Sequence, residues 1–257
     1  MNADFIMEKE ICNLMLELAK IDYQEPLPEL NQQFLQVWGK HYSRILHLVP
    51  KERERGKVLE VGVGYGVLAV MLRRLFHCDL VATEHPSRGY IYAEEFRNFM
   101  DHEGVTIVPH DLAEPFSFSD MTFDMVLYCD VIEHLPTEII SYSLREIKRV
   151  LKREGTLILS TPNLSRLSNR IKFLQGRGIN PPIFPRKIGE TYDHIREFTL
   201  DEIETVLSGD YRIIRREYGL IPFFNKSYNA MNCLLFHLFH SLGDELYILA
   251  RARKNGF

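Results

Sequence analysis

A short apolar run that leads into three closely spaced glycines constrains the fold more than any other part of this sequence. Residues 58–61 read Val-Leu-Glu-Val, and Gly62, Gly64 and Gly66 follow at alternate positions. A helical pattern begins directly afterwards, at Val67. A buried strand that turns on glycines into a helix is typical of the first unit of a parallel α/β sheet. The alternative is a tight turn that binds nothing.

From residue 57 onwards, short β-branched runs alternate with amphipathic helical segments. This alternation predicts a doubly wound, Rossmann-like α/β fold. We expect a mostly parallel sheet of seven strands with an antiparallel edge strand at the C-terminal end. Helices should connect the first strand to the second, the second to the third and the fourth to the fifth. The expected strands are residues 58–61, 79–83, 105–108, 123–128, 156–160, 211–218 and 245–250.

The segments outside this repeating pattern predict a cover and a lid. Two helical patterns, Phe5–Lys20 and Leu30–Leu48, are separated by Pro26 and Pro28, and we expect residues 1–50 to form an N-terminal helical cover. Residues 51–257 should form one domain with a lid insertion at about 164–198.

Composition excludes several classes of protein. The formal net charge of −4 and a pI near 6.2 provide no basic field for nucleic acid. The four cysteines are isolated, which indicates reduced thiols rather than a disulfide framework or a zinc site. The N-terminus is acidic, unlike a signal peptide, and no apolar run is long enough for a transmembrane segment. We therefore expect a cytoplasmic protein. The sequence leaves its oligomeric state open.

Carboxylates stand near the ends of the first three strands. Glu60 precedes the glycines, Glu84 closes the second strand and Asp111 follows the third. The glycine spacing differs from the G-x-G-x-x-G of dinucleotide sites, and an acid beside it suits a ligand with an ammonium and a sulfonium rather than a pyrophosphate. Glu84 can accept hydrogen bonds from two ribose hydroxyls, and Asp111 can reach an adenine amino group. Alternatively, these two acids are solvated.

These segments together resemble the class I S-adenosylmethionine (SAM)-dependent methyltransferases, in particular the small-molecule group that includes the ubiquinone-biosynthesis O-methyltransferases. The resemblance covers about residues 56–163 and includes 123–126, 130–135 and 151–157, with a weaker match at 194–199. It implies SAM as the cofactor. The residues it assigns to the cofactor are Glu60, Gly62, Gly64, Gly66, Glu84, Asp111, Leu112 and Asp130.

The resemblance also points to catalytic candidates beyond the fourth strand. Asp130, Glu133 and His134 follow that strand, and His194 lies after a long irregular segment. We expect His134, Asp130 and His194 to act on the acceptor, with His134 as a general base. In ubiquinone-type enzymes this cluster can hold a divalent cation. Here Asp130 shortens one arm by a methylene, so we expect no metal. The alternatives are a structural hydrogen bond for His134, a helix-dipole acid for Glu133 and an exposed loop position for His194.

Residues 162–189 contain six basic residues and no acidic one. Arginine suits phosphate and carboxylate, so this basic segment predicts an anionic acceptor bound by Arg170, Arg177, Tyr192 and Arg196. The alternative is a solvated basic face. The apolar run Met231–Phe239 is expected to pack in the core, with a lipid or a second subunit as the alternative occupant.

The sequence thus predicts a SAM-dependent methyltransferase that acts on the oxygen of a small-molecule or glycan-precursor acceptor. Nucleic acid is not an expected partner, whereas peripheral lipid contact stays open. Two other functions are compatible with the same residues: a SAM-binding protein that regulates or supports a partner without catalysis, and an NAD-dependent oxidoreductase. The second needs a different glycine spacing.

Overall fold

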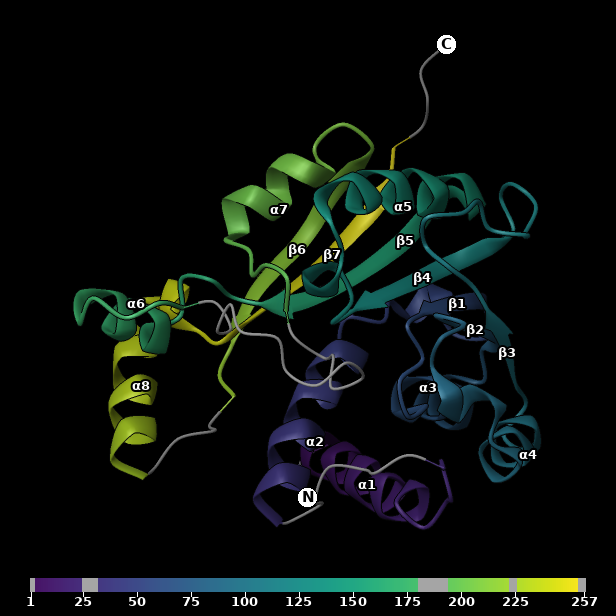
Figure 1. Ribbon diagram of the computed structural model, residues 1–257, viewed down its shortest axis with the longest axis horizontal. Helices are drawn as coiled ribbons and strands as arrows, with labels where there is room; N and C mark the ends of the chain where they lie inside the picture. The colour runs from purple at the N-terminus through teal and green to yellow at the C-terminus, as the bar shows by residue number, and fades with distance from the viewer. Residues whose placement is uncertain (1–2, 25–31, 180–193, 222–225, 254–257) are drawn as a thin grey trace.

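The strand pattern folds into one sheet in the computed structural model, which describes residues 3–24, 32–179, 194–221 and 226–253 (Figure 1). Seven strands lie in the order β3-β2-β1-β4-β5-β7-β6. Their bounds are β1 Lys57–Val61, β2 Asp79–Glu84, β3 Val105–Pro109, β4 Phe123–Cys129, β5 Leu151–Pro162, β6 Tyr211–Gly219 and β7 Glu245–Ala252.

The predicted fold class is confirmed. Strands β1 to β5 pair in parallel, whereas β7 pairs antiparallel with both β5 and β6. The antiparallel pairing is therefore at the expected C-terminal edge, with β6 as the outermost strand. The chain runs outward from β1 to β3 and then crosses to β4, so β1 and β4 flank the switch point of the sheet, where α/β proteins bind ligands.

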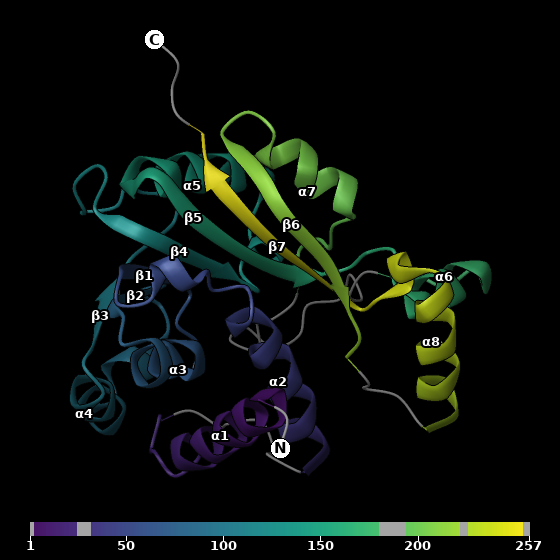
Figure 2. The same ribbon diagram turned by 180° about the vertical axis from the view of Figure 1, so that it is seen from behind.

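Helices cover both faces of the sheet (Figures 1 and 2). One face carries α1 Ala3–Leu18, α2 Gln32–Leu46, α3 Val67–Phe76 and α4 Glu94–His102, and the other carries α5 Thr137–Val150 and α7 Leu200–Leu207. Successive strand residues point to opposite faces, so β4 contributes Met125 and Leu127 to one apolar core and Val126 and Tyr128 to the other. The three predicted connecting helices are α3, α4 and α5.

The predicted N-terminal helices correspond to α1 and α2, whose ends all lie within two residues of the expected bounds. Their buried residues, such as Ile11 and Ile45, belong to the same apolar core as the sheet residue Val58. The division at residue 50 stays a prediction.

Two elements differ from the sequence expectation. Strand β5 begins at Leu151 rather than 156, because its first residues pair with Phe123 of β4 before a register shift. Helix α7 was missed, although a capping box marks its start. The Thr199 hydroxyl accepts a hydrogen bond from the Glu202 backbone N–H at 3.3 Å, and the Glu202 carboxylate accepts one from the Thr199 N–H at 2.8 Å.

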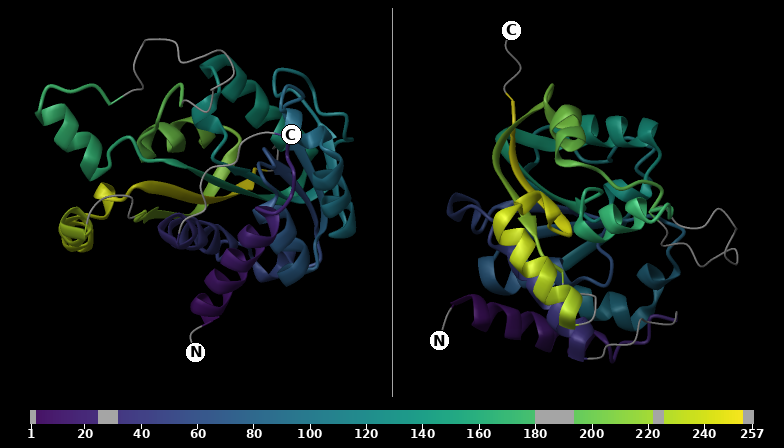
Figure 3. Two further views of the ribbon diagram at one scale, coloured as in Figure 1. Left: turned by 60° about the horizontal axis from the view of Figure 1, so that its bottom comes forward. Right: turned by 90° about the vertical axis from the view of Figure 1, so that its left-hand side faces the viewer.

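The remaining helices are α6 Leu167–Leu174, α8 Lys226–Leu238 and four 3-10 turns at Lys51–Arg53, Gly89–Tyr92, Ile132–His134 and His240–Leu242. Helices α6 and α8 lie at one end of the molecule, opposite α3 and α4 (Figures 1 and 3). The expectation of core packing for the 231–239 run is wrong, since Met231, Leu234, Leu238 and Phe239 are exposed. Within the described ranges, no helix is both long and apolar enough to cross a membrane.

Candidate active site

The glycine turn between β1 and α3 forms the floor of the site. Gly66 has φ of +84°, in the left-handed region, and a Cβ there would lie 2.8 Å from the Met100 side chain. Gly64 also has positive φ, but nothing lies within 4 Å of where its Cβ would be. Gly66 is thus required for the turn and its packing, whereas Gly64 leaves open space in which a ligand can approach the backbone.

A cavity of about 650 Å³ lies over this turn. Its wall comes from distant segments: α1, α2, the glycine turn, and residues at or just beyond the ends of β4, β5, β6 and β7. Most of the wall is apolar or aromatic, including Met15, Leu18, Tyr23, Trp38, Tyr42, Val63, Tyr65, Leu68 and Ile221. The titratable residues in the wall are His41, Glu60, Asp130, Glu133, His134, His194 and Glu245, beside the tyrosines and Cys129.

Glu60 is a buried acid at the bottom of this cavity. Only 4% of it is exposed, and its Oε2 has no hydrogen-bond partner among the described residues. Burial, together with the charge of Glu84, raises the pKa of its carboxyl well above the ordinary value. A cation next to this oxygen would favour the ionised carboxylate, and so it would oppose the effects of burial and of the Glu84 charge on the pKa. Glu60 and the space over Gly64 therefore fit a cofactor that carries an ammonium group, as SAM does.

The other predicted cofactor acids lie around the outer side of the glycine turn. The Glu84 Oε2 accepts hydrogen bonds from the Gly64 N–H at 3.1 Å and the Tyr90 hydroxyl at 2.8 Å. Asp111 is about half exposed, with 47% of its side chain accessible, and pairs with the His85 imidazole at 3.6 Å. Glu84, Asp111 and the partly buried Leu112 are not part of the cavity wall, and their contacts with ribose and adenine stay predictions.

Asp130, at the end of β4, is held by residues of two other elements. Its Oδ2 lies 2.7 Å from the His41 Nε2 of α2, and its Oδ1 accepts a hydrogen bond from the Ser160 hydroxyl of β5 at 2.8 Å. The His41 Nδ1 lies 2.9 Å from the Tyr247 hydroxyl of β7. Burial alone would raise the pKa of Asp130, but the charge and hydrogen bond of His41, with Ser160 and His134, lower it. Asp130 is thus an anion.

Because an ionised carboxylate only accepts hydrogen bonds, the His41 Nε2 must carry the proton that Asp130 receives. In the neutral tautomer, Nδ1 then accepts the Tyr247 O–H. Burial raises the pKa of that tyrosine, which keeps its proton in place. His41 was missed because it stands in an amphipathic helix far from any motif, and no local pattern marks it.

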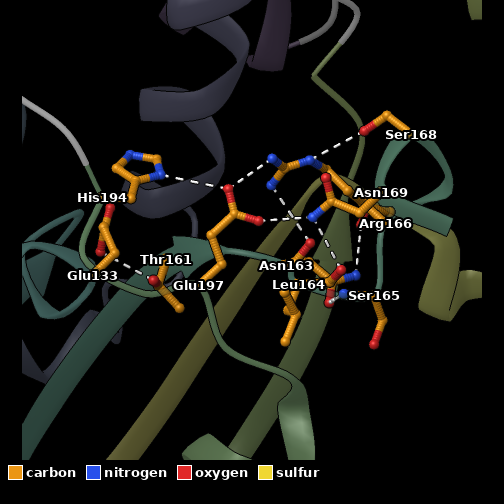
Figure 4. Close-up of polar contacts among 11 residues, drawn as sticks. Glu133, Thr161, Asn163, Leu164, Ser165, Arg166, Ser168, Asn169, His194 and Glu197 are labelled. Carbon is orange, nitrogen blue, oxygen red and sulfur yellow. Dashed lines mark hydrogen bonds and ion pairs between the residues drawn. The ribbon is translucent and has the colours of Figure 1, made fainter. Parts of the chain in front are cut away.

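Glu133, His134 and His194 meet at the cavity wall. One ligand atom of each lies within 4.8 Å of those of the other two, and the two imidazole rings are 5.1 Å apart. The Thr161 hydroxyl donates a hydrogen bond to the Glu133 carboxyl at 3.0 Å (Figure 4). Burial and the neighbouring Asp130 charge raise the pKa of Glu133 well above the ordinary value. Each of these three side chains can hold a proton. One carboxylate and two imidazoles are also ligands that a divalent cation can bind.

Glu197 is a second residue that sequence reasoning missed. Its carboxylate lies between His194, at 3.5 Å, and two residues of the α6 segment, Arg166 at 2.7 Å and Asn169 at 2.8 Å (Figure 4). Burial would raise its pKa, but hydrogen bonds from His194 and Asn169 and the Arg166 charge lower it. Glu197 thus connects a cavity residue to α6. Its position in the segment 194–199, which resembles the family, was the available signal.

Three of the predicted acceptor-binding residues, Arg170, Arg177 and Arg196, are not in the cavity wall. Arg170 is exposed and donates to the Ser165 carbonyl at 2.7 Å, and Arg177 is exposed beyond the end of α6. Arg196 pairs with Glu202 and stacks on Phe198. Tyr192 lies outside the described residues. Their contacts with an acceptor stay predictions.

Parts of this chain are similar to known proteins. Residues 59–159 match the family model described as a methyltransferase domain. Over 72% of its length the chain is 26% identical to a Mycobacterium tuberculosis protein named "Probable S-adenosylmethionine-dependent methyltransferase", and it spans only 58% of that protein. The structure of the N-methyltransferase NodS of Bradyrhizobium japonicum, solved with S-adenosyl-L-homocysteine, is similar to this chain with a TM-score of 0.58 and 13% identity, over 93% of this chain and 98% of that chain.

A SAM-dependent methyltransferase structure from Methanosarcina mazei is also similar, with a TM-score of 0.57 and 16% identity over 82% of this chain and 97% of that chain. Residues 59–159 of the chain thus match a methyltransferase domain, and its sheet has the fold of solved SAM-dependent methyltransferases.

Removing the His41 side chain tests the connection between α2 and the sheet. His41→Ala leaves the Asp130 carboxylate and the Tyr247 hydroxyl without their partner, so we expect the free energy of unfolding to fall by about 3 kcal/mol. His47→Ala, a change at an exposed position just beyond the same helix, should cost less than about 1 kcal/mol. Urea unfolding of both variants measures the difference. Equal losses would show that the hydrogen-bonded chain contributes nothing specific.

Proposed function

We propose that this protein transfers a methyl group from SAM to a small acceptor bound in the cavity over the glycine turn. The observation that carries the proposal is the unpartnered Oε2 of Glu60, buried beside the open space over Gly64. An unpaired buried carboxyl oxygen is costly unless a ligand supplies the donor. The ammonium of SAM is such a donor, and the methyltransferase relatives support this choice of cofactor.

When bound, SAM supplies an electrophilic methyl group on a sulfonium sulfur. The chain then has to align an acceptor oxygen with that methyl group, exclude water and remove the acceptor's proton. The helices α1 and α2 contribute the apolar wall that excludes water. His134 is the proposed base: it takes the hydroxyl proton as the oxygen–carbon bond forms and the carbon–sulfur bond breaks. The nearby Asp130 anion stabilises the imidazolium that results.

The charges in the cavity wall bear on the acceptor. Among the described residues the wall contains the carboxyl groups of Glu60, Asp130, Glu133 and Glu245 but no lysine or arginine. Glu245 is 8% exposed, and its Oε2 has no partner in the described part of the chain. Asp130 is an anion, and burial raises the pKa of the other three carboxyl groups, so an anionic acceptor would find no favourable charge here. The lining favours an acceptor with an apolar body and a neutral or cationic group that donates a hydrogen bond to Glu245. The basic segment supports the anionic alternative, through Arg170 and Arg177.

Cofactor binding is tested at Glu84. Glu84→Ala removes two predicted charge-assisted hydrogen bonds to the ribose, each worth about 1.5–3 kcal/mol, so calorimetry should show at least tenfold weaker binding of S-adenosylhomocysteine. Glu94→Ala, the same change at an exposed position of α4, should bind normally. Melting curves check that Glu84→Ala remains folded, because Glu84 also supports Gly64. Unchanged affinity would reject this assignment.

Acceptor charge is tested with phenols that share one ring and carry an ammonium, a hydroxymethyl or a carboxylate arm. With tritiated SAM, the wild type should methylate the ammonium and hydroxymethyl compounds at least tenfold faster than the carboxylate. Glu245→Gln should reduce that preference, because the donor group of the acceptor loses its charged partner. The double variant Arg170→Ala/Arg177→Ala should keep it. Preference for the carboxylate, lost in the double arginine variant, would establish the anionic acceptor instead.

A further inference from the structure

Exposed apolar side chains gather on α6 and α8, two helices that the proposed reaction does not use. On α6, 74% of Phe173 and 87% of Leu174 are exposed. On α8 the exposed fractions reach 66% at Leu234 and 67% at Leu238, and Phe239, next in the chain, is 59% exposed. Soluble surfaces carry scattered apolar residues, but adjacent large ones at such exposure mark a contact surface.

Helix α8 exposes an apolar stripe, while Leu235 and Phe236 on its other side are half-buried. Met231, Leu234 and Leu238 are spaced three and four residues apart, so they form one stripe, and all three are exposed. Asn232 is instead 3% exposed, and its amide donates to the Asp244 carboxylate at 3.3 Å. The helix is thus fixed through a polar residue with its apolar stripe turned outward.

The charge around this apolar stripe is one-sided. Neither residues 163–179 nor residues 226–243 include an aspartate or glutamate, although the whole chain has 35 acidic residues. Arg166 is neutralised by Glu197, whereas Arg170, Lys172 and Arg177 form no ion pair in the described part of the chain. A basic and apolar surface without acids complements an anionic one. It does not complement itself, because two copies would bring their arginines together.

The two helices also continue directly from the cavity. Pro162, in the cavity wall, leads into α6, and Ile221, also in the wall, precedes α8. Both helices lie at the same end of the molecule (Figures 1 and 2). The ends of β5, β6 and β7 line one side of the cavity. A flat anionic surface that contacts α6 and α8 would therefore lie close to that side.

We propose that α6 and α8 dock the protein on the surface of a bilayer that contains anionic lipids. The exposed leucines and phenylalanines enter the boundary between headgroups and acyl chains, and Arg170, Lys172 and Arg177 pair with lipid phosphates. Apolar burial combined with basic charge is the usual basis of such peripheral binding. This proposal concerns a surface and does not depend on the chemistry in the cavity.

Sedimentation with vesicles tests the proposal. The full chain should bind vesicles of phosphatidylcholine and phosphatidylglycerol at least tenfold better than vesicles of phosphatidylcholine alone. Salt at 0.5 M should weaken this binding, because it shortens the screening length of charge interactions to about 4 Å. Leu234→Ser/Leu238→Ser and Arg177→Glu should each reduce binding at least fivefold. The matched controls are Val206→Ser/Ile214→Ser, at exposed apolar positions of α7 and β6, and Arg97→Glu on α4. These should bind like the wild type.

Circular dichroism and melting temperature check that every variant is folded, which is expected because the altered side chains are exposed. Absence of binding to anionic vesicles would overturn the proposal, as would equal losses in the test and control variants. Analytical ultracentrifugation provides the remaining outcome. A dimer that Leu234→Ser/Leu238→Ser dissociates, without vesicle binding by the wild type, would assign the surface to a second copy of the chain instead.

Discussion

The hydrogen-bonded chain from Asp130 through His41 to Tyr247 is the interaction on which the rest of the site depends. It joins the end of β4, the N-terminal helix α2 and the late strand β7, which are far apart in the sequence. Because Asp130 is an anion beside a buried imidazole, the pair holds α2 in one position over the glycine turn. Without that position the cavity would lose Trp38, Tyr42 and His41 from its wall. The N-terminal helices are therefore part of the binding site.

The sequence predicted the central fold well because its signals are local. The glycine turn, the alternation of strands and helices, and the acids at strand ends can each be recognised within about ten residues. The structure places Glu60, Gly64, Asp130, Glu133, His134 and His194 around one cavity, as the predicted edge of the sheet requires. It does not place Arg170 or Arg177 there. A one-sided charge count along the sequence predicts a basic surface, but it does not predict which side of the molecule that surface faces.

Residues that act across long sequence distances escaped prediction for a physical reason. His41, Glu197 and Glu245 take their roles from partners on other elements. The residues around His41 and Glu245 do not differ from those of an ordinary helix or strand, and only the family-like segment 194–199 marks the region of Glu197. The run 231–239 was misread for a related reason. Its apolar content is that of a core helix, and only the burial of Asn232, with Leu235 and Phe236 half-buried, shows that the stripe of Met231, Leu234 and Leu238 faces outward.

Two kinds of charged group thus lie in different places. Carboxyl groups and histidines line the cavity, where burial raises the pKa of Glu60, Glu133 and Glu245. Basic residues of the α6 segment that form no ion pair in the described part of the chain lie at the same end of the molecule as the exposed apolar side chains of α6 and α8. This division separates recognition of the cofactor and acceptor from contact with a larger surface, and it explains how a chain of net negative charge can carry a basic end.

A crystal structure of the protein with S-adenosylhomocysteine tests the central claim most directly. The account predicts that the amino group of the ligand lies within hydrogen-bond distance of Glu60, that its backbone passes over Gly64, and that its sulfur faces the cavity beside His134. Electron density for the ligand elsewhere, or a Glu60 carboxyl that stays without a partner in the complex, would contradict the account.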